Sequence, residues 1–331
     1  MKINFKQILG MLRRWDHVDY TTSIYIARIL GYVLSSLYFV SHSFNMKKTR
    51  DFTRKRNYFV SKKIELTKKY NKVSNDKFNN RFLKNDRYDF NGIYLPKIDN
   101  AHVIETVYAD TLKIYVEKND NYNYKIVDEM DKTLPEGSYC YFGPNGEDIT
   151  VKPGYTVIDA GAWIGDFSAY ASKKGAHVYA FEPSPSNIKF LEKTVEYNKG
   201  NGGSIAIVPY GLGSKEEDVG FVENDERENS GANAFTNSEG RESHMYLHVI
   251  TIDSWVLKNK IKRVDFIKAD IEGYERFMLE GAEKTLKEHE PVLSICTYHY
   301  PDDPVILKEL ILQANPRYKI IQRKKKLFAY V

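Results

Sequence analysis

From Thr156 onward the sequence alternates between short apolar runs and longer runs with helical periodicity, and this alternation constrains the fold more than any other feature. Strands that alternate with helices form a mostly parallel sheet covered on both faces. The expected strands are 156–160, 178–182, 205–210, 264–269 and 292–297. The expected helices are 167–174, 185–198, 274–289 and 304–314. With an antiparallel hairpin at 318–322 and 327–330, the pattern predicts an α/β fold with a doubly wound, Rossmann-like sheet.

The first expected strand ends in VIDAGAWIGDFSAY, which places Asp159, Gly161 and Gly165 at the turn into the next helix. Glycines at such a turn let the backbone approach a ligand, and doubly wound sheets bind nucleotides beyond the carboxyl ends of their strands. Dinucleotide enzymes have GxGxxG there, whereas this chain has GxxxG, with Trp163 in place of the second glycine. The motif therefore argues against NAD. The leading Asp159 suits a ligand with a cationic group, such as an amino group or a sulfonium.

The second expected strand, HVYAFEPSP, ends in Glu182, 21 residues after Gly161. An acidic residue about 20 residues after the glycine-rich turn accepts hydrogen bonds from ribose hydroxyls in nucleotide-binding sheets. An ordinary tight turn and a helix-capping carboxylate would explain the two features separately. Because they occur in register with a strand, a helix and a second strand, we expect a nucleoside-type ligand.

A second polar constellation lies in RVDFIKADIEGYE. Strand alternation places Lys268 and Asp270 on one face, although a central parallel strand is usually apolar on both faces. Because a buried charge is costly unless it is paired or used, these two residues are predicted to be functional or mutually paired. Glu272 and Glu275 begin the next helix, where the dipole favours carboxylates. Capping explains Glu275, and for Asp270 and Glu272 both function and capping stay open.

The fifth expected strand leads into CTYHYPDD, which puts His299 at the same rim of the sheet. Histidine can exchange a proton near neutral pH, although a hydrogen-bonded structural role is an alternative. The spacing of Asp270, Glu272 and His299 indicates no dedicated metal site, so no metal is predicted.

The motifs VIDAGAWIGDFS, VYAFEPSPSN, VDFIKADIEGYE and TYH resemble those of the FkbM family of S-adenosylmethionine-dependent methyltransferases, over about residues 140–331. The resemblance implies a seven-stranded class I methyltransferase sheet and S-adenosylmethionine as methyl donor. It also implies a hydroxyl acceptor, often on a sugar or a polyketide. By this resemblance Asp159, Gly161 and Gly165 line the methionine end, Glu182 binds the ribose, and the KADIEGYE segment faces the transferred methyl group.

The chemistry implied by the resemblance requires a group that removes the proton of the acceptor hydroxyl. The candidates for this base are Asp270, then His299, then Glu272. Lys268 would orient the acceptor or neutralise Asp270. The polar insertion at 214–244 is expected either to shape the acceptor pocket or to be a solvated excursion.

The first hundred residues differ from the rest in charge, with 21 lysines and arginines against 8 aspartates and glutamates. An apolar run at 24–40 contains Arg28 and has helical periodicity, which predicts an amphipathic helix rather than a membrane span or a signal peptide. Basic residues follow it at 47–69. Residues 24–69 would contact an anionic membrane surface or nucleic acid, or would form a helical arm packed on the body.

These observations predict three parts: a basic helical N-terminal extension and linker at 1–92, a β-rich lead-in at 93–150, and a methyltransferase domain at 151–331. The predicted function is O-methylation of a hydroxyl on a glycan or lipid-linked saccharide. An NAD-dependent sugar-modifying dehydrogenase or epimerase, and a non-catalytic membrane or nucleic-acid adaptor, are the alternatives. Two cysteines 156 positions apart provide neither a disulfide framework nor a zinc motif. They favour a cytoplasmic protein, peripheral at the inner face of the membrane if the basic segment binds there.

Overall fold

The computed structural model describes residues 76, 79–98, 117–118, 124–125, 139–222, 234–235, 245–323 and 325–331. The chain divides into two compact units, Met1–Lys77 and Phe78–Val331. The helices and strands below belong to the second unit. The predicted amphipathic helix and polybasic stretch at 24–69 lie outside the described residues.

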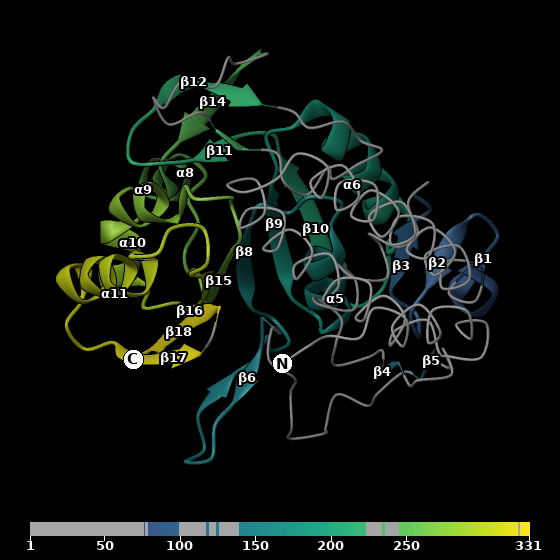
Figure 1. Ribbon diagram of the computed structural model, residues 1–331, viewed down its shortest axis with the longest axis horizontal. Coiled ribbons are helices and arrows are strands. Elements are labelled where there is room, and N and C mark those ends of the chain that lie inside the picture. Colours follow the sequence, from purple (N-terminus) through teal and green to yellow (C-terminus); the bar gives the residue numbers. More distant parts are fainter. Residues whose placement is uncertain are drawn as a thin grey trace, which may run out of the picture. The chain divides into compact units, whose positions relative to one another are not determined.

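A seven-stranded sheet in the order β10-β9-β8-β15-β16-β18-β17 forms the centre of the second unit (Figure 1). Its parallel strands are β8 (Thr156–Ala160), β9 (His177–Phe181), β10 (Ser204–Val208), β15 (Phe266–Ala269) and β16 (Val292–Cys296). β17 (Lys319–Arg323) and β18 (Lys326–Tyr330) form the predicted hairpin, and β18 pairs antiparallel with β16. The predicted doubly wound, Rossmann-like sheet is confirmed. The strand order reverses between β8 and β15, the point at which such sheets bind ligands.

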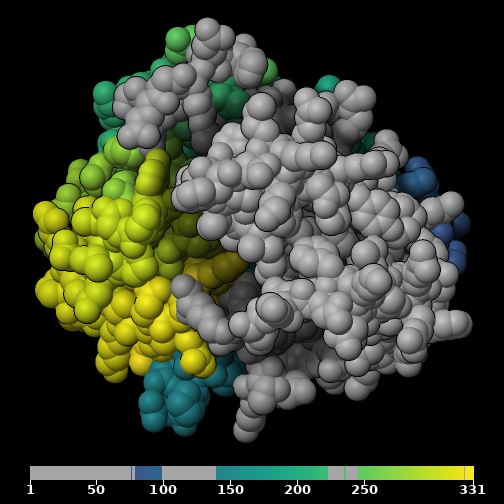
Figure 2. Space-filling model, viewed as in Figure 1, coloured from purple at the N-terminus to yellow at the C-terminus, as the bar shows by residue number. Residues whose placement is uncertain are grey.

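Helices cover both faces of this sheet, because successive residues of its strands point to opposite sides. On β8, Val157 joins one hydrophobic cluster, together with Phe167, and Ile158 joins the other, together with Trp255. The helices are α5 (Asp166–Lys173), α6 (Pro185–Tyr197), α8 (Ile252–Lys258), α9 (Glu275–Glu280), α10 (Glu283–Glu288) and α11 (Asp303–Ala314). α9, α10 and α11 form one continuous side of the molecule in Figure 2, in yellow and yellow-green.

The single helix expected at 274–289 is instead the pair α9 and α10, which Gly281 separates. A Cβ at Gly281 would lie 2.0 Å from the carbonyl oxygen of Gly213. The backbone at Gly213 therefore lies too close to Gly281 for any side chain to fit at this position. Apolar periodicity alone does not reveal such a break.

The N-terminal part of the second unit contains a three-stranded sheet of β1 (Leu83–Lys84), β2 (Arg87–Asp89) and β3 (Tyr94–Pro96). It packs on the body, because the Asn198 amide bonds both the N–H and the carbonyl of Tyr94, and Tyr88 and Phe90 are fully buried. The boundary expected near residue 92 therefore lies inside this unit. Residues 79–92 were assigned to the N-terminal extension and linker, but their aromatic side chains Phe82, Tyr88 and Phe90 join the hydrophobic core.

Short hairpins and a second sheet complete the described structure. Two antiparallel pairs fall in the predicted β-rich lead-in, β4 (Glu117–Lys118) with β5 (Tyr124–Lys125) and β6 (Tyr141–Phe142) with β7 (Asp148–Ile149). The second sheet has the order β11-β14-β12-β13, with β11 (Gly211–Leu212), β12 (Glu217–Val222), β13 (Ala234–Phe235) and β14 (Met245–Ile250). The insertion at 214–244 thus contains strands β12 and β13. Within the described ranges, no helix combines the length and apolar character that crossing a bilayer requires.

Candidate active site

A pocket of about 530 Å³, including the space at its open mouth, lies at the carboxyl ends of β8, β9 and β15. Its walls also include residues of the second sheet. The lining residues are Gly161, Trp163, Phe181, Glu182, Pro183, Asn187, Tyr210, Gly211, Leu212, Phe221, Phe235, Asp270, Ile271, Glu272 and Tyr274. Four of the predicted site residues therefore line it, namely Gly161, Glu182, Asp270 and Glu272. The other four, Asp159, Gly165, Lys268 and His299, do not.

Asp159 and Lys268 form a buried ion pair beneath the glycine-rich turn. The Lys268 Nζ lies 3.0 Å from Asp159 Oδ1 and donates to the carbonyl of Gly161 at 2.7 Å. The Asp159 side chain is fully buried, and the Ser168 hydroxyl donates to it. Burial opposes the charge on Lys268, but Asp159 and Asp270 outweigh it and raise the pKa of this ammonium. Lys268 is thus paired with Asp159, whereas the sequence suggested Asp270, and both residues support the turn from below.

Gly161 and Gly165 permit close packing at this turn. Gly161 has φ +72°, and a Cβ there would lie 2.0 Å from the carbonyl oxygen of Asp270. At Gly165, with φ +86°, a Cβ would lie 2.5 Å from Leu191 Cδ1 on α6. Gly165 therefore serves the contact between helices rather than the pocket. Between them, Trp163 lines the pocket with a φ of +50°.

Glu182 is a buried carboxylate at the end of β9, with 5% of its surface exposed. Its Oε2 accepts from the N–H of Trp163, and its Oε1 accepts from the N–H of Ser184 and from the Asn187 amide. Burial raises the pKa of Glu182 to about 7, in spite of these hydrogen bonds. The carboxylate is thus held rigidly at the pocket wall.

Asn187 provides a second acceptor at the same wall, a residue that the sequence analysis did not single out. Its Oδ1 is buried and has no hydrogen-bond donor within the described part of the chain. Buried polar atoms are rarely left without a partner. Together with Glu182, this free acceptor fits a ligand that offers hydroxyl or amino hydrogens, such as a nucleoside.

Asp270 follows β15 and is held by two tyrosines. The Tyr139 hydroxyl donates to Oδ2 at 2.5 Å, and the Tyr298 hydroxyl donates to Oδ1 at 2.8 Å. Burial raises the pKa of Asp270, but Lys268, Lys326 and the Tyr139 hydrogen bond lower it overall. Asp270 is therefore ionised at neutral pH. No sequence pattern indicated Tyr139, which lies 131 positions before Asp270.

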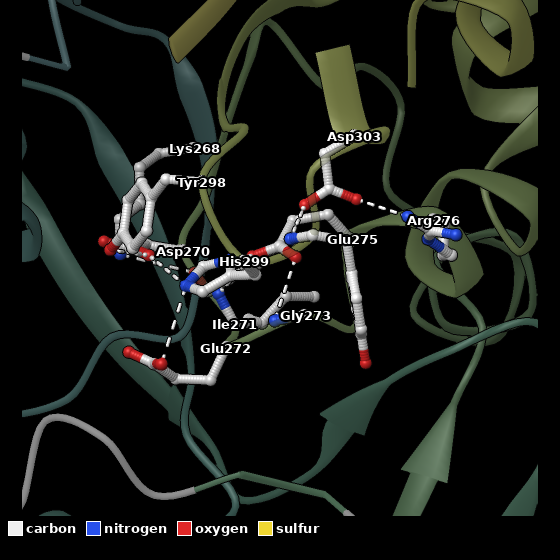
Figure 3. A network of polar contacts seen from close by, with 12 residues as sticks. Lys268, Asp270, Ile271, Glu272, Gly273, Glu275, Arg276, Tyr298, His299 and Asp303 are labelled. Carbon is white, nitrogen blue, oxygen red and sulfur yellow. Dashed lines mark hydrogen bonds and ion pairs between the residues drawn. The ribbon is translucent and has the colours of Figure 1, made fainter. Parts of the chain in front are cut away.

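His299 lies between three carboxylates (Figure 3). Its Nε2 is 3.6 Å from Asp270 Oδ1 and 3.5 Å from Glu272 Oε2, and its Nδ1 is 3.1 Å from Glu275 Oε1. Burial lowers the pKa of the imidazole, but Glu275, Asp270 and Glu272 outweigh it and raise this pKa to about 9. Burial and the nearby Asp270 raise the pKa of Glu272 to about 7. Asp270, Glu272 and His299 thus form one cluster, as their common rim position predicted.

Glu275 shapes the loop that carries Glu272. Its Oε1 accepts from the N–H of Ile271 at 2.8 Å, and its Oε2 accepts from the N–H of Gly273 at 3.1 Å. Glu275 thus caps backbone N–H groups just before α9, as the capping interpretation expected. Glu272 itself has φ +54° and faces the pocket. Strained backbone of this kind concentrates at functional sites.

The family described as the methyltransferase FkbM domain matches residues 159–318. This segment is an FkbM methyltransferase domain. The domain contains all eight predicted site residues and ends at the start of the C-terminal hairpin. The resemblance read from the four sequence motifs is confirmed.

Individual relatives and solved structures share low sequence identity with this chain, as three examples show. The hexuronic acid methyltransferase AglP of Haloferax volcanii is 29% identical over 157 residues, which are 47% of this chain and 61% of that protein. The FkbM methyltransferase structure from Methylobacillus flagellatus is 23% identical, with a TM-score of 0.41, over 54% of this chain and 44% of that chain. Fibrillarin of Aeropyrum pernix, solved with natively bound S-adenosylmethionine, is 11% identical, with a TM-score of 0.36, over 65% of this chain and 93% of that chain. The chain thus spans about three fifths of the length of this curated protein, AglP.

Proposed function

We propose that this protein is an S-adenosylmethionine-dependent methyltransferase that methylates a hydroxyl group of a glycan or lipid-linked saccharide, with 151–331 as its methyltransferase domain. The observation that carries the proposal is the pocket of the FkbM domain, where a rigid carboxylate lies beside the glycine-rich turn, together with a buried acceptor that has no donor within the described ranges. The predicted NAD alternative lacks support, because Trp163 occupies the place of the second glycine.

Glu182 and Asn187 would hold the nucleoside part of the cofactor. The two carboxylate oxygens of Glu182 already accept three hydrogen bonds from the protein, which leaves about one of the four acceptor sites of a carboxylate free. Asn187 Oδ1 adds a second acceptor. The backbone at Gly161 and Trp163 forms the adjoining wall. When bound, S-adenosylmethionine supplies an electrophilic methyl group.

Glu272 is the residue placed best to take the proton of the acceptor hydroxyl. Asp270 and Glu272 both line the pocket, but both Asp270 oxygens accept hydrogen bonds from tyrosine hydroxyls. Among the described residues, Glu272 has one ion-pair contact, with His299. His299 lies behind the two carboxylates and would hold them in place, and Lys268 would support the turn through Asp159.

The charge of the pocket favours a neutral acceptor. Three carboxylates and no lysine, arginine or histidine line it among the described residues. A hydroxyl avoids the repulsion that a carboxylate acceptor would meet there. The AglP relative is named as a hexuronic acid methyltransferase, and this name supports a saccharide as the acceptor class. Binding of residues 24–69 to an anionic membrane stays a prediction.

Calorimetric titration with S-adenosylmethionine tests the cofactor part of the proposal. We expect the wild-type chain to bind, and Glu182→Ala and Asn187→Ala to weaken binding at least about tenfold, because each removes a buried hydrogen-bond acceptor. The matched control is Glu192→Ala, which removes an exposed carboxylate from α6, the helix that carries Asn187. This variant should bind S-adenosylmethionine as the wild type does. Absence of heat with the wild type, or enhancement of NADH fluorescence instead, would contradict the proposal.

Transfer of a labelled methyl group to saccharides tests the reaction. Glu272→Gln should reduce kcat about 100-fold, since general-base catalysis contributes about this much, while the affinity for S-adenosylmethionine stays unchanged. Equal kcat for this variant and the wild type would remove Glu272 from the mechanism.

A further inference from the structure

Three side chains with metal-binding atoms converge at one edge of the pocket. Asp270 and Glu272 come from the loop after β15, and His299 comes from the loop after β16 (Figure 3). One ligand atom from each lies within 4.8 Å of the other two. The sequence spacing, with Glu272 and His299 27 positions apart, did not reveal this group. The fold brings it together because β15 and β16 are neighbouring parallel strands.

The orientation of His299 points to a ligand. Its side chain is 8% exposed, and its Nε2 is buried without a hydrogen-bond partner within the described residues. On the other side of the ring, Nδ1 faces the carboxylate of Glu275 at 3.1 Å. Metal-binding histidines commonly place one nitrogen toward a carboxylate in this way, which fixes the ring and leaves the other nitrogen to the metal.

We propose that Asp270, Glu272 and His299 bind a divalent cation of the Mg²⁺ or Mn²⁺ type at the edge of the pocket. Carboxylate oxygens suit these ions, and one imidazole favours Mn²⁺ over Mg²⁺. The cation neutralises two carboxylates that would otherwise repel each other. Because Asp270 and Glu272 line the pocket, the remaining coordination positions are open to water or to a substrate oxygen. Only this last role rests on the proposed function.

A second grouping, Glu275, His299 and Asp303, also has ligand atoms close together. Its two carboxylates are each 1% exposed and do not line the pocket. Glu275 accepts from two backbone N–H groups, and Asp303 accepts from Arg276 and from the N–H of Tyr300. These contacts make that grouping a support for the first one rather than a competing site.

Cation binding is compatible with the proton transfer assigned to Glu272. Figure 3 shows one oxygen of this carboxylate facing His299 and the other turned away from it. One oxygen can therefore bind the cation while the other accepts a proton. Without a metal, a protonated His299 would form ion pairs with the three carboxylates in the same geometry. The experiment must distinguish this state from the metal-bound one.

The test is a Mn²⁺ titration of the full-length, chelator-treated chain, followed by the electron paramagnetic resonance signal of free Mn²⁺ and carried out without S-adenosylmethionine. We expect saturable binding of one Mn²⁺ per chain, and displacement by Mg²⁺. His299→Gln and Glu272→Gln should each weaken binding at least about tenfold, the loss typical of a removed ligand or its support. Glu272→Gln guards against misfolding, because Glu272 is partly exposed.

His248→Gln is the matched control. His248 is an exposed histidine that also lies between two carboxylates, 2.8 Å from Asp218 and 3.6 Å from Glu216, and this variant should bind Mn²⁺ as the wild type does. A wild type that takes up no Mn²⁺, or binding that both site variants leave unchanged, overturns the proposal in favour of a protonated His299. Titration with S-adenosylmethionine in excess chelator is a separate readout, so failure of the metal site and failure of the proposed function are distinguishable.

Discussion

Replacing Lys268 by Met would test whether the buried ion pair supports the glycine-rich turn. Lys268 and Asp159 are 4% and 0% exposed and lie opposite each other on β15 and β8. Removing one partner of a buried pair costs about 3–5 kcal/mol, because the other charge stays buried without compensation. The lost hydrogen bond to the Gly161 carbonyl adds about 1 kcal/mol. We therefore expect Lys268→Met to lower the free energy of unfolding by about 4–6 kcal/mol.

The double variant with Asp159→Asn separates the charge from the packing. It leaves no unpaired charge, so its destabilisation should fall short of the sum of the two single variants by about 2–3 kcal/mol. Urea unfolding measures all three, and Lys287→Met, at an exposed position on α10, should stay within about 0.5 kcal/mol of the wild type. Additive single effects, or a Lys268→Met variant as stable as this control, would refute the reasoning. If the pair also positions the turn, Lys268→Met weakens S-adenosylmethionine binding under conditions where it remains folded.

Three further predictions concern single positions. Gly161→Ala should destabilise the fold by about 3 kcal/mol or more, since its Cβ would overlap the Asp270 carbonyl; Gly200→Ala, at φ +86° with open space, should cost only about 1 kcal/mol by urea unfolding. Burial raises the pKa of Glu182 to about 7 from 4.5 in spite of the positive charge of Lys268. The contribution of this carboxyl to stability therefore falls as pH rises from 4.5 to about 7. The affinity for S-adenosylmethionine, measured by calorimetry, should rise from about pH 6 to about pH 8 in the wild type and should not depend on pH in this range in Glu182→Gln. Thr251→Ala removes the hydroxyl that accepts from the N–H of Ser254 at the start of α8, and thermal unfolding should show a loss of about 1 kcal/mol.

The parallel sheet was predictable from the sequence because its strands are apolar on both faces and its helices are periodic. Gly161 and Glu182 were predictable for the same reason, since their positions follow from where strands end. The pairing of Lys268 with Asp159 required the order of the strands, which places β15 beside β8 and which no local pattern encodes. Contacts between side chains that are far apart in the sequence could not be predicted for the same reason. The acceptor at Asn187, for example, becomes visible only once its buried Oδ1 is seen without a partner among the residues that the structure describes.

The segment before the FkbM domain takes part in the site. Tyr139 precedes residue 159, where the family match begins, yet its hydroxyl holds Asp270, and its ring packs edge-on against Phe167 on α5. The same ring lies 4.0 Å from the ammonium of Lys326 and 5.1 Å from that of Lys268, so it links the C-terminal hairpin to the centre of the sheet. A chain that began at residue 159 would leave Asp270 without this donor and two ammonium groups without the ring between them. The smallest part of the protein that keeps the carboxylate cluster in place therefore extends beyond the segment that the family defines.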